Sequence, residues 1–120
     1  MFEVTVRDQF ASAHQLHGYD GPCRYMHGHT WKVEIVITGQ DLDRIGLLAD
    51  FRGLKTKLKE VLQPLDHVVL NELPAFKDIN PSTENIARHI YRTLKESLRP
   101  LNLKHVQVWE SDITSVIYYE

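Results

Sequence analysis

Two stretches of alternating apolar and polar residues, 2–14 and 27–38, constrain the fold of this chain most strongly. Successive side chains of a β-strand point to opposite faces, so each stretch predicts a strand with one buried face. The first stretch ends at His14, and the second begins with His27 and His29. Residues 15–26 between them contain two glycines and a proline, which is typical of a loop. An antiparallel pair is the simplest arrangement.

After the second predicted strand, the spacing of the apolar residues changes from two residues to about four. Apolar residues at helical spacing predict helices over 51–62 and 83–98, with Asp50 and Ser82 as N-caps. Alternation returns over 106–110 and again over 114–119. Two strands, two helices and two strands predict an α+β fold, ββααββ, with an antiparallel sheet and both helices on one face. We expect a single domain over residues 1–120.

Composition excludes several classes of protein. A hydrophobic fraction of 42% with 25% charged residues is typical of a soluble globular domain. The 14 Lys and Arg residues are scattered and the net charge is -2, so we expect no nucleic-acid partner. No stretch reaches the roughly 20 apolar residues that cross a bilayer, so we expect no membrane association. A single cysteine and the lack of a signal-peptide pattern favour a cytoplasmic location.

His27 and His29 flank a glycine at the start of the second strand. Residues i and i+2 of a strand point the same way, about 6.6 Å apart. In a hairpin, His14 would lie beside them on the same inward face. Three neutral imidazoles at one point match a catalytic zinc site with an open fourth position. The alternative is that these histidines are hydrogen-bonded residues at the ends of strands.

Three further positions carry reactive groups. Cys23 lies on the loop before His27, where a metal or a protonated histidine would favour its thiolate; the alternative is a small buried hydrophobic residue. Asp66 and His67 follow the first helix, and a carboxylate beside an imidazole can orient it for proton transfer. Glu110 is predicted to point toward the apolar layer, where it needs a partner such as the N–H groups of a guanidine-like heterocycle. A solvent-exposed glutamate is the alternative.

These residues, taken in order, resemble the 6-pyruvoyl-tetrahydropterin synthase superfamily. The resemblance extends nearly from end to end and rests on F-x-x-A-H (10–14), C-x-x-x-H-G-H (23–29), L-D-H (65–67), P-S-T-E-N (81–85) and Glu110. The three-residue gap between Cys23 and His27 is similar to that of the 6-carboxytetrahydropterin-forming branch of queuosine biosynthesis. Pyruvoyl-forming members typically have a longer gap. Ser111 stands where many relatives have threonine.

The resemblance implies a role for each of these residues. It implies zinc bound by His14, His27 and His29, Cys23 as the proton acceptor, and Glu110 as the anchor of the pterin ring with a possible part in the relay. His67 would be the relay partner with Asp66 beside it, and Ser82 and Thr83 would line the pterin pocket. It also implies the tunnelling fold, in which subunits join their sheets into a barrel. Active sites then lie between the subunits of a homo-oligomer, expected to be a hexamer.

The function implied is a zinc-dependent lyase that converts 7,8-dihydroneopterin triphosphate to 6-carboxy-5,6,7,8-tetrahydropterin, acetaldehyde and triphosphate. The first alternative is a 6-pyruvoyl-tetrahydropterin synthase or another pterin side-chain lyase. The others are a noncatalytic pterin- or purine-binding oligomer with structural zinc, and a metal-dependent hydrolase. The sequence leaves open the oligomer size, the metal loaded in the cell and the residues that bind the triphosphate.

Overall fold

The computed structural model describes residues 1–120 and contains a four-stranded antiparallel sheet in the order β1-β2-β3-β4. The strands are β1 (Phe2–His14), β2 (His27–Gly39), β3 (Asn102–Ser111) and β4 (Thr114–Tyr118). Helices α1 (Phe51–Leu62) and α2 (Thr83–Ser97) lie between β2 and β3 in the chain. The predicted order ββααββ is confirmed, and so is the antiparallel sheet.

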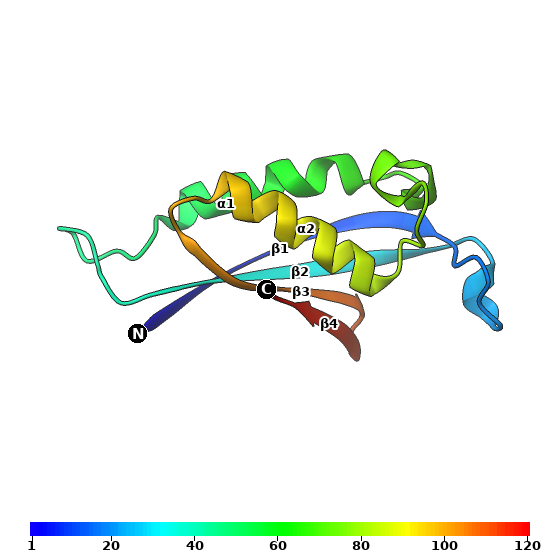
Figure 1. Cartoon of the computed structure of the whole chain (residues 1–120), viewed down its shortest axis with the longest axis horizontal. Helices are drawn as coiled ribbons and strands as arrows, with labels where there is room; N and C mark the ends of the chain where they lie inside the picture. Colours follow the sequence, from blue (N-terminus) through cyan, green and yellow to red (C-terminus); the bar gives the residue numbers. More distant parts are fainter.

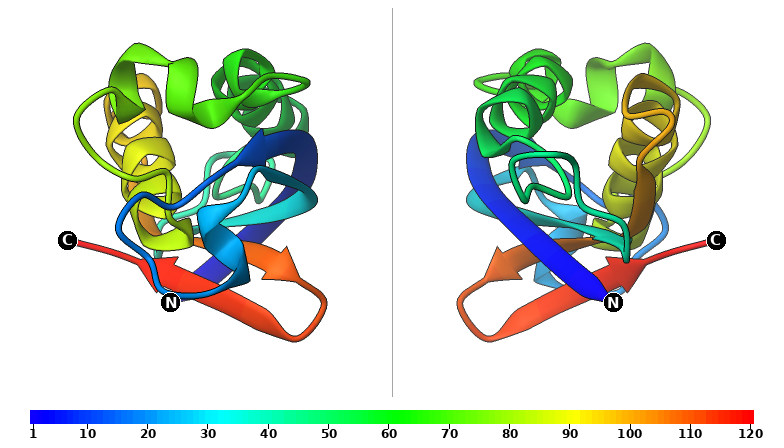
Figure 2. Two further views of the ribbon diagram at one scale, coloured as in Figure 1. Left: turned by 90° about the vertical axis from the view of Figure 1, so that its right-hand side faces the viewer. Right: turned by 90° about the vertical axis from the view of Figure 1, so that its left-hand side faces the viewer.

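The molecule has two layers. Both helices lie on one face of the sheet, and no helix covers the opposite face (Figure 1). The two end-on views separate the layers clearly (Figure 2). The expected placement of both helices on one face is therefore confirmed. Neither helix has the length and apolar composition needed to cross a lipid bilayer.

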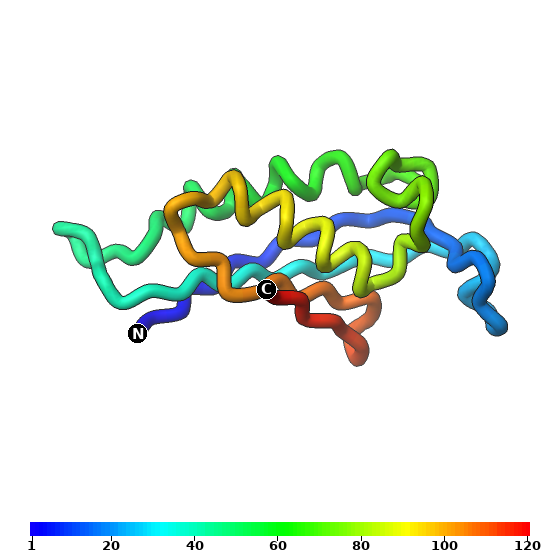
Figure 3. The backbone as a smooth tube through the Cα atoms, in the orientation of Figure 1, coloured from blue at the N-terminus to red at the C-terminus, as the bar shows by residue number.

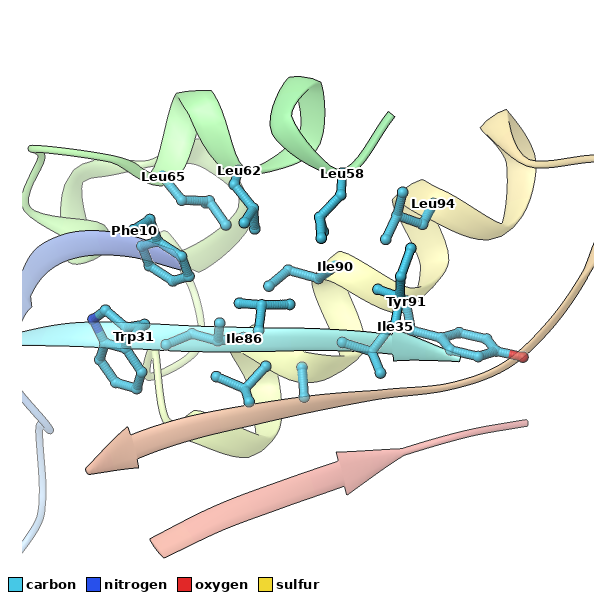
Figure 4. Close-up of a cluster of buried hydrophobic side chains, with 14 of the residues drawn as sticks. Phe10, Trp31, Ile35, Leu58, Leu62, Leu65, Ile86, Ile90, Tyr91 and Leu94 are labelled. Carbon is cyan, nitrogen blue, oxygen red and sulfur yellow. The ribbon is translucent and has the colours of Figure 1, made fainter. Parts of the chain in front are cut away.

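The core fills the space between the helices and the inner face of the sheet. The helical faces that contact it are those with the four-residue apolar spacing, Leu54, Leu58 and Leu62 of α1 and Ile86, Ile90 and Leu94 of α2. From the sheet, Trp31, Ile35 and Val108 are fully buried. Complete burial of one such side chain contributes about 1.5–3 kcal/mol, so the sheet and helices stabilise each other through this layer (Figure 4).

The N-caps were predicted correctly. The Asp50 carboxylate accepts a hydrogen bond from the Arg52 backbone N–H, and the Ser82 hydroxyl accepts one from the Asn85 N–H at 3.2 Å. Some boundaries differ from the prediction. Helix α2 ends at Ser97 with Leu98 as its C-cap, and β3 begins at Asn102 because its pairing with β2 extends to Thr38. Strand β4 ends at Tyr118.

Four single-turn 3₁₀ helices were not predicted, because turns this short have no periodicity to detect. They cover Pro22–Arg24, Gln63–Leu65, Leu70–Glu72 and Pro74–Phe76. The loop over 15–26 and the segment over 66–80 lie at the end of the molecule where β1 finishes, whereas residues 40–49 lie at the other end (Figure 3). The first of these ends carries the histidine cluster.

Candidate metal centre

The register of β1 and β2 brings the histidines together. His14 pairs with His27, Ser12 pairs with His29, and Phe10 pairs with Trp31. Alternate residues of each strand share a face, so these six side chains all point the same way. Gly28 and its partner Ala13 belong to the opposite face. The convergence expected from the two alternation patterns is therefore present in the fold.

The three imidazoles form a compact group. One ring nitrogen from each of His14, His27 and His29 lies within 4.8 Å of the others. His14 Nδ1 is 2.7 Å from the Pro81 carbonyl oxygen, and His27 Nδ1 is 2.7 Å from the Tyr25 carbonyl oxygen. A carbonyl can only accept, so both Nδ1 atoms are the protonated donors and the Nε2 lone pairs face away from them.

The Nε2 atoms of all three histidines are buried and have no hydrogen-bond partner. Buried polar groups without a partner are costly, and a cation is the partner that three converging lone pairs fit. Burial also lowers the pKa of His14 and that of His29, which favours the neutral form that binds metals. The close approach of the three rings, their unpartnered Nε2 atoms and these lowered pKa values together fit a bound metal ion.

Trp31 forms the apolar wall behind these imidazoles. Its side chain is fully buried, with ring centroids 4.9 Å from His14 and 5.1 Å from His29 in edge-on arrangements. On its other side it stacks on Phe10 at 5.9 Å. The histidines therefore project from the end of the hydrophobic core, and their orientation depends on a packed aromatic pair.

Glu110 lies next to the histidines. Its Oε1 is 3.9 Å from His29 Nε2, and its Oε2 accepts a hydrogen bond from the Thr83 hydroxyl at 3.1 Å. The Glu110 side chain is 30% exposed to solvent. A carboxylate held on one side and open on the other can bind a ligand with N–H donors. Ser82 precedes Thr83 and caps α2.

Cys23 and the Asp66–His67 pair are not joined to each other within the chain. Cys23 is half-buried in the 3₁₀ turn, and no hydrogen bond links its thiol to another residue. Asp66 is 2.8 Å from His67 Nδ1, and the His67 side chain is 80% exposed. His67 also adopts the left-handed backbone conformation (φ 57°), which is uncommon for residues other than glycine.

Asp66 fixes the start of the segment that carries His67. Its Oδ1 accepts a hydrogen bond from the Ala11 N–H of β1 at 2.9 Å. That bond, with the contact to His67, holds the pKa of Asp66 below its usual value. The carboxylate is therefore ionised near neutral pH and orients the imidazole.

Sequence reasoning missed several residues that shape this site. The carbonyls of Tyr25 and Pro81, which orient two histidines, carry no side-chain signal. Asn71 and Asn80, which bind the backbone beyond His14, are separated from it by more than fifty residues. Local patterns predict which face a residue occupies but not such distant partners.

The chain is similar to known proteins over its whole length. The family model described as 6-pyruvoyl tetrahydropterin synthase matches residues 3–120. The 6-carboxy-5,6,7,8-tetrahydropterin synthase of Haemophilus influenzae is 32% identical, with 100% of both chains covered. The human 6-pyruvoyl tetrahydrobiopterin synthase is 31% identical, covering 97% of this chain and 90% of the relative.

The fold agrees with these similarities. A structure of Caenorhabditis elegans 6-pyruvoyl tetrahydropterin synthase superimposes with a TM-score of 0.87 and 27% identity, covering 100% of this chain and 97% of that one. The ββααββ chain thus has the tunnelling fold that the motifs imply. On the full-length sequence match and this shared architecture, the chain belongs to the 6-pyruvoyl tetrahydropterin synthase family.

Proposed function

We propose that this protein is a zinc-dependent lyase that converts 7,8-dihydroneopterin triphosphate and water to 6-carboxy-5,6,7,8-tetrahydropterin, acetaldehyde and triphosphate in queuosine biosynthesis. The observation that carries the proposal is the convergence of three buried, unpartnered Nε2 atoms beside Glu110. The three-residue gap between Cys23 and His27 and the similarity to the Haemophilus influenzae relative favour the 6-carboxy product. The single cysteine is consistent with work in a reducing cytoplasm.

In this proposal His14, His27 and His29 hold the zinc ion. Bound there, zinc supplies Lewis-acid polarisation of oxygen atoms on the substrate side chain. Glu110 accepts hydrogen bonds from the amino-pyrimidine edge of the pterin, and Thr83 keeps its carboxylate oriented through the bond at 3.1 Å. Ser82 and Thr83 line the pocket, so the reacting carbon is held at a fixed position.

Cys23 and His67 move the protons. The thiolate of Cys23 accepts a proton from the substrate side chain, and His67, oriented by Asp66, relays it. Since His67 is 80% exposed and has no bond to Cys23 in its own chain, we propose that the two meet across a subunit boundary. A homo-oligomer, expected to be a hexamer, then forms the complete site.

The human relative supports an alternative outcome on the same scaffold, because it is named for 6-pyruvoyl tetrahydrobiopterin synthesis and is 31% identical. Both reactions need a pterin anchor, a metal and a proton acceptor. They differ in the bond cleaved, and only the 6-carboxy route releases acetaldehyde. A binding protein or a hydrolase would use the metal centre but would leave Cys23 and His67 without a role.

The deciding experiment is mass spectrometry of the products that the zinc-loaded protein forms from 7,8-dihydroneopterin triphosphate, with acetaldehyde trapped in parallel. Carboxytetrahydropterin with trapped acetaldehyde supports the proposal. Pyruvoyltetrahydropterin without acetaldehyde moves the protein to the alternative activity, and no product from either route contradicts both. Cys23→Ala is the matched variant; full turnover by it would remove the thiol from the mechanism.

A further inference from the structure

Two asparagine side chains bind the backbone immediately beyond the metal centre. Asn71 Oδ1 accepts from the Gln15 N–H at 2.9 Å, while Asn71 Nδ2 donates to the Gln15 carbonyl at 2.9 Å. Asn80 makes the same pair of bonds to His17, both at 2.9 Å. Each amide thus replaces the two hydrogen bonds that a neighbouring strand would provide. We call Asn71 and Asn80 the asparagine clamps.

The clamps hold the segment to which the Cys23 loop is attached. Gln15 and His17 are alternate residues, and Leu16 between them points its N–H the other way. That N–H donates to the Cys23 carbonyl at 2.9 Å. The backbone of Cys23 is therefore attached to Leu16, and both neighbours of Leu16 are bound by the asparagine clamps. No other hydrogen bond joins the Cys23 backbone to the rest of the chain.

The same edge of β1 also carries His67. The His67 N–H donates to the Ala11 carbonyl, and the Ala13 N–H donates to the Val68 carbonyl at 3.1 Å. Asp66 begins this contact at Ala11, and Asn71 ends it at Gln15. The segment over 66–71 consequently runs alongside β1 and fixes where His67 emerges.

Asn80 is itself held in place. Its carbonyl accepts a hydrogen bond from Asn85 Nδ2 at 2.8 Å, and Arg88 donates to Asn85 at 2.5 Å. The next residue, Pro81, accepts from His14 Nδ1. One short stretch therefore contacts a metal-binding histidine and the backbone that supports Cys23.

We propose that Asn71 and Asn80 are positioning residues for the reaction, because they set the place of the Cys23 thiol relative to the histidine cluster. The inference rests on the role proposed for Cys23. Neither asparagine needs to touch substrate. Misplacement of a reacting group by about 1 Å can cost on the order of 100-fold in rate, so loosening the clamp is expected to affect kcat.

The test uses Asn80→Asp and Asn71→Asp, which keep the side-chain volume and one acceptor but remove the Nδ2 donor. Cys23 is the only thiol, so its rate of alkylation by iodoacetamide across pH reports the loop directly. We expect alkylation to rise several-fold, kcat to fall about 10-fold or more with little change in KM, and zinc content to stay at the wild-type level. Asn102→Asp, at the exposed start of β3, is the control and should match the wild type.

Wild-type alkylation and wild-type kcat in folded variants would overturn the inference, whatever their melting temperatures. A purely structural role would lower Tm without changing the alkylation profile well below Tm. Should the aspartate variants fail to fold, Asn80→Ala, which adds no charge, is measured in the same way. If the wild type shows no lyase activity, the proposed function fails, and the alkylation rates still decide whether the clamps hold the loop.

Discussion

At the scale of single residues, the three histidines differ from the others in having an unpartnered buried nitrogen. His29→Ala removes one of these ligands, so we expect the purified protein to lose its bound zinc. His105→Ala is the matched control, because His105 lies on β3 outside the cluster. Metal content by atomic absorption checks the prediction. Stoichiometric zinc in the His29 variant would contradict the proposed ligand set.

Trp31 allows a second prediction at this scale. Its edge-on contacts with His14 and His29 fix the imidazoles, so Trp31→Phe should weaken zinc binding by about 10-fold even though the ligands remain. Competition with a chelator gives the Kd. Tyr91→Phe, which alters an equally buried aromatic residue packed against Tyr118 instead, is the comparison. Equal zinc affinities in the two variants would show that Trp31 does not tune the centre.

At the scale of elements, the N-terminus of α2 combines a helix cap with the proposed pterin pocket. Ser82→Ala removes the hydroxyl that accepts from the Asn85 N–H, and should lower the free energy of unfolding by about 1 kcal/mol. Ser82→Asp keeps an acceptor at the cap and should restore that stability. Urea unfolding measures both.

The two variants also separate the cap from ligand binding. If the Ser82 hydroxyl contacts the substrate, both variants should raise KM although only the alanine variant is destabilised. Unchanged KM in both would restrict Ser82 to the cap.

The strands, the helices and the close approach of the three histidines to one another were predictable from the sequence. The hydrogen bonds that hold the surrounding segments in place were not. Alternation places His14, His27 and His29 on one face, and the short loop makes the pairing of their strands local. The clamps join residues 56 and 63 positions apart, and no periodicity encodes such contacts. The absence of a hydrogen bond between Cys23 and His67 was also hidden, because the order of motifs along the chain does not tell which side chains touch.

At the scale of the whole molecule, buried and half-buried histidines make stability depend on pH. Burial lowers the pKa of His14, His29 and His89 below the ordinary 6.5. The unfolded chain therefore binds protons at a higher pH than the folded chain. In the metal-free protein, the free energy of unfolding should fall as the pH drops below about 6.5.

His89 lies outside the histidine cluster and tests this dependence separately. The slope of unfolding free energy against pH is proportional to the number of protons taken up on unfolding. His89→Gln should reduce that number by a fraction of one proton and so make the slope smaller. Urea titrations of the chelator-treated protein between about pH 5 and pH 8 measure the slope. Identical slopes in variant and wild type would assign the dependence to other groups.

The outward direction of His67 leads to a prediction about assembly. Cys23→Ala and His67→Ala should each be inactive as pure oligomers, since each removes one partner of the proposed relay. If the two residues meet across a boundary, subunits unfolded together in equal amounts and reassembled form some sites with both groups intact. Random mixing pairs an intact Cys23 with an intact His67 in about one quarter of sites, so about one quarter of wild-type activity should return.

A site completed within one chain would give no activity in any mixture, because every subunit would carry one defect. The control is Cys23→Ala mixed with the double variant Cys23→Ala/His67→Ala, which has no intact thiol and must stay inactive under either arrangement. Recovery of activity in the first mixture, together with no activity in the second, would place the relay between subunits. It would also give a role to the His67 imidazole, which contacts Asp66 and is 80% exposed in its own chain.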